Sequence, residues 1–482
     1  MLNRLGSGLK YFGYLSLLAL ILSIAPARVL ATTYYLAPAA GGGSDANNGT
    51  SAGTPWLTPN HALSCGDVIA AAASTSYASG NFQNFGAVSC PSGNNVAWLK
   101  CATFDACKIS TSGQSGMTVN QSYWGVQGWE VTTSGNNAVC FTAYPSSGNI
   151  HHIIFANNVA NGCGAGGIST FNAGSNGEDY LIIVGNIAYN AASSSVHCYS
   201  GISIYQPVQT DTVPGTHMYV AGNFSWNNVE PNPCNGTAPT DGEGIIFDSF
   251  DGSQGGIATY SQQAVAANNI LLSNGGKGLE AYQSVVGSAH APIYFVRNTV
   301  WGNNKDTNES GTWCGEVDIA VAYNVTAYGN LAVTNSATGC GSNPDYAFYV
   351  AQGDGSNSVH DNWGYSASGY NNGLNSSGSF AYGSGNTWGT DPSLASPAIP
   401  GAPNCSGFAS VPACMATVIA NFKPRNVSAQ AYGYQPPLTT SASDALFPSW
   451  VCNVNLPAGL ITKSCGTSQL APPTGLVVLN VQ

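Results

Sequence analysis

The sequence predicts an all-β chain that winds as a parallel solenoid, and three observations lead to that prediction. Short runs of β-branched and aromatic residues are separated by Gly and Asn. Long amphipathic helical patterns are absent. Two strand-like phrases recur at irregular intervals of about 30 residues, which is typical of a solenoid coil.

The first phrase is apolar–x–x–Asn–apolar, and its copies lie 28, 37, 46, 29, 32 and 32 residues apart. Asn tolerates the left-handed backbone of a turn, and stacked side-chain amides can hydrogen-bond from coil to coil. The two longest gaps predict loops on consecutive coils, and such insertions usually build the binding side of a solenoid. The copies are centred on Asn158, Asn186, Asn223, Asn269, Asn298, Asn330 and Asn362.

The second phrase alternates with the first and begins Gly-Ile or Gly-Leu, with looser copies at 314–320 and 346–351. A β-propeller is the main rival interpretation, but its repeats run longer and carry four strands. A β-sandwich does not easily explain seven copies of the Asn phrase. The clear copies of the second phrase begin at Gly167, Gly201, Gly244 and Gly278.

The N-terminus reads as a secretion signal, because Arg4 and Lys10 precede an apolar run at 11–25 and small residues then lead to Ala31. We therefore expect a secreted, extracellular protein, with the periplasm or cell surface as alternatives. The run is short for a membrane span. An uncleaved anchor remains the alternative, and after cleavage we expect no membrane association.

All fourteen cysteines follow this segment, which suggests disulfides in an exported chain. Sequence does not fix their pairing, and no CxxC or Cys/His zinc spacing is present. The sequence-near couples are Cys101/Cys107, Cys140/Cys163, Cys314/Cys340, Cys405/Cys414 and Cys452/Cys465.

The charge balance is acidic, because residues 32–482 carry eight Lys and Arg against 22 Asp and Glu, a net charge of −14. This argues against nucleic acid, which is bound by Lys and Arg patches. Apolar residues make up 44% of the chain and aromatics 10%, enough to fill a core. Between residues 109 and 421 the cations are Lys277, Arg297 and Lys305.

Two segments carry a resemblance to a known family. The stretch 34–69, YYLAP…GDVI, resembles the entry segment of bacterial proteins of the pectate-lyase-like superfamily, and 242–282 is similar to a phrase in their central coils. The resemblance covers roughly residues 34–395 and implies a right-handed parallel β-helix. This fold hosts hydrolases, epimerases, lyases, tailspikes and adhesins, so fold alone does not assign a chemistry.

The chain organisation follows from this resemblance and from the repeats. We expect a signal peptide at 1–31, an N-terminal cap with the first coils at 32–110, and the β-helix at 111–395. Residues 396–482 are rich in Pro and Ser and predict a disulfide-containing C-terminal cap, because the last coil of a solenoid would otherwise expose core. A small carbohydrate-binding or attachment module is the alternative there.

Strand alternation then places the charges on one outward strip. With Ile245 and Phe247 inward, Glu243 and Asp248 face outward on one coil. Lys277 and Glu280 face outward on the next coil, and Asp318 on the coil after it. Tyr205 and Tyr282 flank Asp248. Tyrosines beside carboxylates on an exposed sheet suit a sugar polymer, so we expect a monomer that binds a polysaccharide.

The first interpretation of the strip is a lyase that cleaves a uronic-acid polymer by β-elimination. The resemblance implies calcium held by carboxylates and a Lys or Arg base. Asp241, Asp248 and Asp251 are the metal candidates, with Glu243 as a further one, and Lys277 is the candidate base. Arg297 could hold a substrate carboxylate. The sequence lacks the vicinal Asp-Asp cluster and the Arg-rich pattern of pectate lyases.

The second interpretation is a glycoside hydrolase with two carboxylates, supplied by Glu280 and Asp318 or by Glu243 and Asp248. The motif set of polygalacturonase-type β-helices is absent. The third is a glycan-binding solenoid or adhesin without catalysis.

Purely structural roles also fit several of these residues. Glu243 and Lys277 suit a cross-strand ion pair, and Asp241 and Asp251 lie beside glycines, as turn residues do. The histidines show no recognisable metal or triad spacing; they include His151, His152, His197, His217 and His290.

Overall fold

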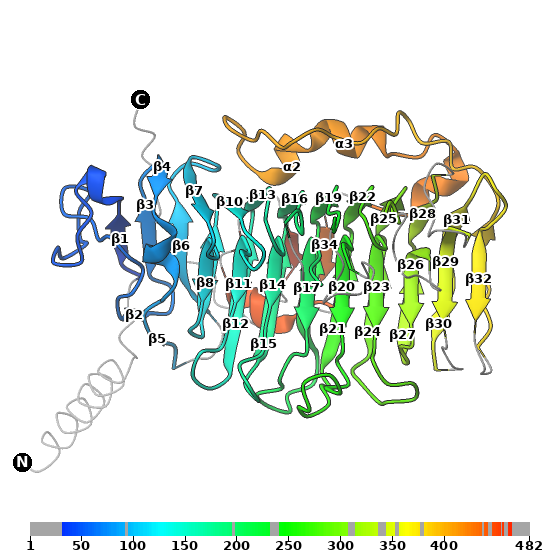
Figure 1. Ribbon diagram of the computed structural model, residues 1–482, viewed down its shortest axis with the longest axis horizontal. Helices are drawn as coiled ribbons and strands as arrows, with labels where there is room; N and C mark the ends of the chain where they lie inside the picture. The colour runs from blue at the N-terminus through cyan, green and yellow to red at the C-terminus, as the bar shows by residue number, and fades with distance from the viewer. Residues whose placement is uncertain are drawn as a thin grey trace, which may run out of the picture. The chain divides into compact units, whose positions relative to one another are not determined.

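Three parallel sheets run along the chain, and a typical coil contributes one strand to each of them (Figure 1). This computed structural model describes residues 31–91, 95–194, 198–231, 241–306, 314–335, 344–351, 356–375, 380–435, 438–441, 446–454, 456 and 461–464. The topology confirms the expected all-β chain that winds as a parallel β-helix. The signal peptide expected at 1–31 lies outside the described residues, apart from Ala31.

The three long sheets have the following strands in the described part of the chain. Sheet 1 has 11: β1 (Thr33–Leu36), β3 (Val68–Ala71), β6 (Ala97–Cys101), β9 (Trp124–Gln127), β12 (Ile150–Ala156), β15 (Glu178–Val184), β18 (Thr216–Ala221), β21 (Gln263–Ala267), β24 (Ile293–Val296), β27 (Val325–Tyr328) and β30 (Ser358–Val359). Sheet 2 has 11: β4 (Ser74–Tyr77), β7 (Cys107–Ser112), β10 (Trp129–Ser134), β13 (Val159–Asn161), β16 (Ile187–Tyr189), β19 (Phe224–Trp226), β22 (Ile270–Leu272), β25 (Thr299–Trp301), β28 (Leu331–Val333), β31 (Trp363–Tyr365) and β33 (Thr387–Trp388). Sheet 3 has nine: β8 (Met117–Val119), β11 (Phe141–Ala143), β14 (Ile168–Thr170), β17 (Ile202–Tyr205), β20 (Ile245–Asp248), β23 (Leu279–Tyr282), β26 (Gly315–Ala320), β29 (Tyr346–Ala351) and β32 (Asn372–Asn375).

Shorter elements complete the described secondary structure. Two small parallel pairs join β2 (Leu63–Ser64) to β5 (Val88–Ser89) and β34 (Leu438–Ser441) to β35 (Ile461–Ser464). The helices are η1 (Ala39–Gly41), η2 (Ser79–Phe82), α2 (Val411–Cys414), α3 (Ala416–Asn421), η4 (Val427–Ala431) and η5 (Ser449–Asn453). In the described residues no helix has the length and apolar character needed to cross a membrane.

The repeated Asn forms a continuous ladder at the corner between sheets 1 and 2. In each coil its amide nitrogen donates to the side-chain oxygen of the next ladder Asn, as from Asn186 to Asn223 at 3.0 Å and from Asn223 to Asn269 at 3.1 Å. The same nitrogen also donates to a backbone carbonyl of the preceding coil, and all seven expected positions take part. The ladder extends one step further, to Asn386. The coil-to-coil hydrogen bonding is therefore confirmed.

The second phrase supplies the strands of sheet 3, and its looser copies are β26 and β29. Ile245 and Phe247 lie in the buried core, as alternation predicts. On the outward face, Asp248 pairs in register with Tyr205 of the preceding coil and with Tyr282 of the next coil. The repeats thus fix which side chains share a column.

The C-terminal region lies along the sides of the β-helix (Figure 1). Helices α2 and α3 place Val411, Met415 and Phe422 against the outer face of sheet 2, where they meet Phe224 and Trp226. Further on, Phe447 and Trp450 pack on the outer face of sheet 1. This region therefore buries apolar surface that belongs to many coils.

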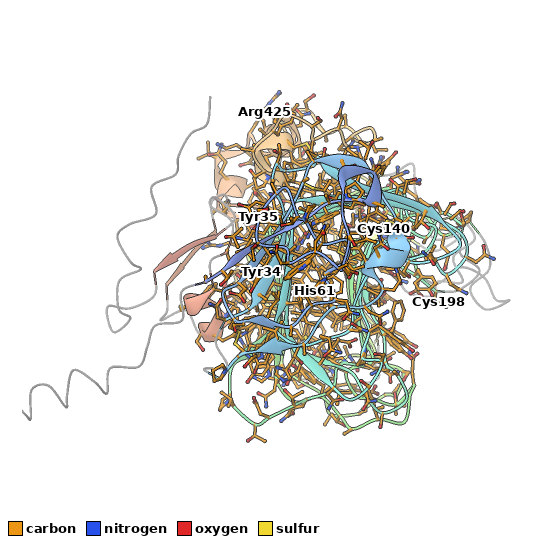
Figure 2. All side chains as sticks on the ribbon, turned by 90° about the vertical axis from the view of Figure 1, so that its left-hand side faces the viewer. Tyr34, Tyr35, His61, Cys140, Cys198 and Arg425 are labelled. Atoms are coloured by element: carbon orange, nitrogen blue, oxygen red, sulfur yellow. A yellow bond between two sulfur atoms is a disulfide. The ribbon has the colours of Figure 1, made fainter. Side chains whose placement is uncertain are left out.

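Figure 2 views the molecule from its N-terminal end, where Tyr34, Tyr35 and His61 are labelled. Trp56 stacks between Tyr34 and His61, with ring centroids 4.4 and 3.9 Å apart. This aromatic stack belongs to the first turns of the chain and contributes apolar packing at the start of sheet 1.

Four disulfides are described. Cys101–Cys107, Cys140–Cys163 and Cys405–Cys414 confirm three of the sequence-near couples, and Cys65–Cys90 adds a fourth pair. For the other two couples, Cys340 and Cys465 lie outside the described residues. Disulfides are typical of proteins that fold in an oxidising compartment.

A carboxyl group is buried inside the β-helix at the start of β15. Glu178 pairs in register with the core residue Ile150, has no exposed surface, and its two carboxyl oxygens have no hydrogen-bond partner in the described part of the chain. Burial raises the pKa of Glu178 well above its usual range. The folded protein therefore holds a proton there that the unfolded chain releases at lower pH.

The free energy of unfolding of wild type is expected to fall as the pH rises from the ordinary Glu pKa to the raised pKa of Glu178. Replacing Glu178 by Gln should make this fall smaller. The wild-type group contributes fully below the unfolded pKa, and its contribution is lost as the pH rises through the folded pKa. The amide carries no titrating proton, so the melting temperature of E178Q should exceed that of wild type more and more with rising pH. Thermal melts across a pH series measure this.

The matched control is Glu130→Gln. Glu130 contacts Lys108, and hydrogen bonds with Asp105, Lys108 and Asn161 outweigh burial and lower its pKa. E130Q should therefore lose stability at neutral pH and converge with wild type in acid. Equal pH dependence of E178Q and wild type would contradict the buried-proton interpretation.

Candidate functional site

The candidate site lies on the outer face of sheet 3, where three successive coils present Tyr205, Asp248 and Tyr282 in one column. All three side chains are half-buried. The hydroxyl of Ser249 donates to Asp248 at 2.7 Å. The strand register confirms that Tyr205 and Tyr282 lie on either side of Asp248 in the sheet.

A second column lies two residues back along the same strands. Ile246 pairs with Glu280, and Glu280 pairs with Asp318 on the next coil. Neighbouring strands are about 4.8 Å apart, so the side chains of Glu280 and Asp318 start from adjacent positions on the same face. This is the adjacency that the sequence predicts for them.

Lys277 lies between two carboxyl groups. Its Nζ is 3.8 Å from Glu243 Oε1 and 3.9 Å from Glu280 Oε1. Ser200 donates a hydrogen bond of 2.6 Å to the other oxygen of Glu243. The close approach of Lys277 to Glu243 agrees with the strip expected from the glycine alignment.

The strip is more deeply buried than expected. Exposed fractions are 0% for Glu243 and Asp318, 3% for Glu280 and 6% for Lys277. The expectation of an exposed sheet therefore holds only for the column of Asp248 and its two tyrosines. Burial also removes the solvent screening that makes surface ion pairs weak.

Burial and like charge shift these carboxyl groups toward their protonated forms. Desolvation raises the pKa of Asp248 well above its usual range, and Asp241 and Glu280 act in the same direction. Desolvation likewise raises the pKa of Glu243 well above its range. The pKa of Glu280 is also raised by burial, but Lys277 and a hydrogen bond with Glu243 oppose the rise. The site thus combines a carboxylic acid with a carboxyl group that a cation helps to ionise.

The three aspartates expected to hold calcium do not form a metal group. No cluster of three or more His, Cys, Asp or Glu in the described residues is arranged to hold a metal ion. Asp251 is turned toward Ser253 and Ser288, whose hydroxyls donate to it at 2.8 and 2.6 Å. Its surroundings are those of a turn residue, the structural alternative given for it.

Arg297 is not part of the sheet 3 site. It follows β24 of sheet 1, has a left-handed backbone with φ of 53°, and is exposed at the corner before ladder residue Asn298. This position does not support the expectation that Arg297 contacts a substrate carboxylate at the acid strip.

The histidines, in contrast, form an arrangement that sequence reasoning missed. His217 Nδ1 lies 2.8 Å from Asp179 Oδ1, and its ring stacks on Tyr180 at 3.7 Å between centroids. The signal was present in the repeat, because His152, Tyr180 and His217 each stand six residues before a ladder Asn. His197 lies outside the described residues.

Known proteins share only a distant likeness with this chain. No protein-family model and no curated protein sequence matches the chain. It is similar to the solved pectate lyase Pel9A (16% identity, 76% of this chain, 84% of that chain, TM-score 0.39). It is also similar to the A-module of mannuronan C-5 epimerase AlgE4 from Azotobacter vinelandii (12%, 68%, 90%, 0.31) and to GH136 lacto-N-biosidase from Eubacterium ramulus (12%, 74%, 67%, 0.33). At these identities and TM-scores the likenesses assign no activity, and the β-helix rests on the sheet topology itself.

Proposed function

We propose that this chain is a secreted carbohydrate-active protein that cleaves a polysaccharide by acid–base hydrolysis on sheet 3. The observation that carries the proposal is Asp248, a half-buried carboxyl group with a raised pKa between Tyr205 and Tyr282. A carboxyl group whose pKa is raised keeps its proton to higher pH, which suits it to give that proton to a leaving oxygen. The two tyrosines offer apolar ring surface to the sugars on either side of it.

Glu280 is the candidate base. It lies one strand over from Asp248 and two residues back on the same face, which corresponds to about 8 Å between backbone positions from the strand rise and strand spacing. Inverting glycosidases separate their two carboxyl groups by about 6.5–9.5 Å to leave room for a water. Lys277, 3.9 Å from Glu280, favours the ionised form that a base requires.

In the proposed hydrolysis, Asp248, Glu280 and one water account for every proton that moves. Asp248 gives its proton to the glycosidic oxygen, and the bond from that oxygen to the anomeric carbon breaks. Water attacks the anomeric carbon from the opposite face, and Glu280 takes a proton from that water. The predicted products are two free sugar ends with inverted configuration at the new reducing end.

The pairs considered from sequence differ in how well they suit this role. Glu243 and Asp248 lie five residues apart along one strand direction, or roughly 16 Å, which disfavours them as a pair. Glu280 and Asp318 lie on adjacent strands and would suit the shorter separation of about 5 Å used by retaining enzymes. The stereochemistry of the product therefore distinguishes Asp248 from Asp318 as the partner of Glu280.

A lyase that acts by β-elimination is the second candidate, because Lys277 lies in the acid cluster and could remove a proton from a uronic acid. Two observations weigh against Lys277 as the base. Its Nζ lies within 4 Å of Glu243 and Glu280, which favours the charged ammonium. In addition, the expected calcium ligands do not converge in the described residues.

The test is incubation with uronic-acid polymers and neutral polysaccharides, each with and without a chelator. New reducing ends without ultraviolet absorbance from unsaturated sugars are the expected result, and chelation should leave the rate unchanged. Unsaturated ends would establish the lyase and sink hydrolysis. Binding without any new ends would favour a non-catalytic glycan-binding solenoid.

A further inference from the structure

A column of four rings crosses sheet 1, whereas the acid strip lies on sheet 3. Tyr123, His152, Tyr180 and His217 occupy equivalent places on successive coils, with centroids 5.0, 4.3 and 3.7 Å apart. The first three have left-handed backbones, with φ of 66°, 57° and 49°. Residues other than Gly adopt such conformations uncommonly, and here they recur at the same place on three successive coils.

A buried network fixes the end of this column. Asp179 is fully buried and accepts hydrogen bonds from Tyr260 at 2.7 Å and from Thr210 at 2.8 Å, and His217 Nδ1 lies 2.8 Å away. The other ring nitrogen of His217 donates to the carbonyl of Val213 at 2.9 Å. These contacts hold the His217 ring and the loop at 206–215 in place, which is the preorganisation that a binding site needs.

A cavity of about 560 Å³ opens beside the rings. One wall is the loop after β17, and another is the C-terminal segment with Phe447 and Trp450. Trp450 is 7% exposed, and its indole N–H has no hydrogen-bond partner in the described part of the chain. A cavity of this size that combines aromatic rings with a few fixed polar groups is typical of small-molecule sites.

The polar groups of the cavity select against anions. Asp211 is exposed at its edge, and the hydroxyl of Tyr180 lies 2.9 Å from both of its carboxylate oxygens. Burial lowers the pKa of His152 to about 3 and also lowers the pKa of His151, so neither ring is charged at neutral pH. The described lining contains no Lys or Arg. A carboxylate-bearing sugar would thus meet Asp211 without a compensating cation.

We propose that this cavity binds a neutral sugar unit of a glycan, with Asp211 as the acceptor for its hydroxyl groups and the aromatic walls as its apolar surface. The site lies on sheet 1 and is separate from the cleavage proposed on sheet 3. It would hold a chain of sugars to the protein whether or not that chain is cut.

The experiment uses full-length protein carrying Asp248→Asn, so that bound glycans are not hydrolysed. Cellohexaose, mannohexaose, xylohexaose and chitohexaose are titrated by calorimetry beside hexagalacturonate and hexamannuronate. At least one neutral probe should bind, and adding Asp211→Ala should weaken its binding about tenfold or more, because hydrogen bonds to a charged group are among the stronger ones in proteins. The control is Asp361→Ala, an exposed aspartate on a distant coil whose loss should not change binding.

Three results would overturn the proposal. They are failure of every neutral probe to bind, unchanged affinity in the D211A background, and equal or tighter binding of the uronic hexamers through Asp211.

Discussion

Asp248→Asn is expected to lower kcat on the cleaved polysaccharide about 10²–10⁴-fold, the usual contribution of a positioned general acid. The change removes the proton that the leaving oxygen receives and keeps the size of the side chain. KM should change little, because Tyr205 and Tyr282 still contact the sugars on either side. Steady-state kinetics with reducing-end detection measure both constants.

The activity is also expected to depend on pH through the protonation of Asp248. The raised pKa of Asp248 keeps the carboxyl group protonated above the usual range of an aspartic acid, so activity should persist there. It should fall as the pH rises through that raised pKa, and this basic limb should vanish in D248N. Asp361→Asn, at a side chain 63% exposed, is the matched control and should keep both rate and profile. A D248N enzyme with wild-type kcat would remove Asp248 from the mechanism.

Asn223→Ala is expected to cost at least about 3 kcal/mol of unfolding free energy, because several buried groups lose their partners at once. The Asn223 side chain accepts from both nitrogens of Asn186 and donates to the carbonyl of Ile183 and to Asn269. It has no exposed surface, so water cannot replace these bonds. Denaturant unfolding followed by circular dichroism measures the loss.

The control for the ladder is Asn176→Ala, at a partly exposed turn residue whose side chain makes no hydrogen bond in the described structure. It should stay within about 0.5 kcal/mol of wild type, as surface substitutions usually do. Similar stabilities for N223A and N176A would mean that the ladder contributes little beyond solvent hydrogen bonding.

Local rules explain why the fold was predictable. Asn recurs where each coil turns from sheet 1 to sheet 2, and alternation around Ile245 and Phe247 separates inward from outward residues. A parallel solenoid converts such repeats directly into columns, so the register of Asp248 with Tyr282 followed from the alignment of two glycines. No contact between distant segments was needed for these inferences.

The burial of the acid strip and the cavity on sheet 1 could not be predicted from the sequence, because both depend on contacts between segments that are distant in the chain. The 0% exposure of Glu243 cannot be read from alternation, which separates core from surface only when nothing covers the outer face. The sheet 1 cavity brings Trp450 beside Tyr180, although 270 residues separate them in the chain. The position of Arg297 at a corner depends on a left-handed backbone that its own residue type does not suggest.

The C-terminal region also has a consequence for the order in which the protein forms. The outer face of sheet 2 contains Phe224 and Trp226, and its cover includes Val411 and Phe422, which are synthesised almost two hundred residues later. Coils can stack on their predecessors as the chain emerges, whereas the sides of the stack stay uncovered until the last part of the chain arrives. The newly made protein therefore passes through an interval in which an aromatic flank is open to unintended partners.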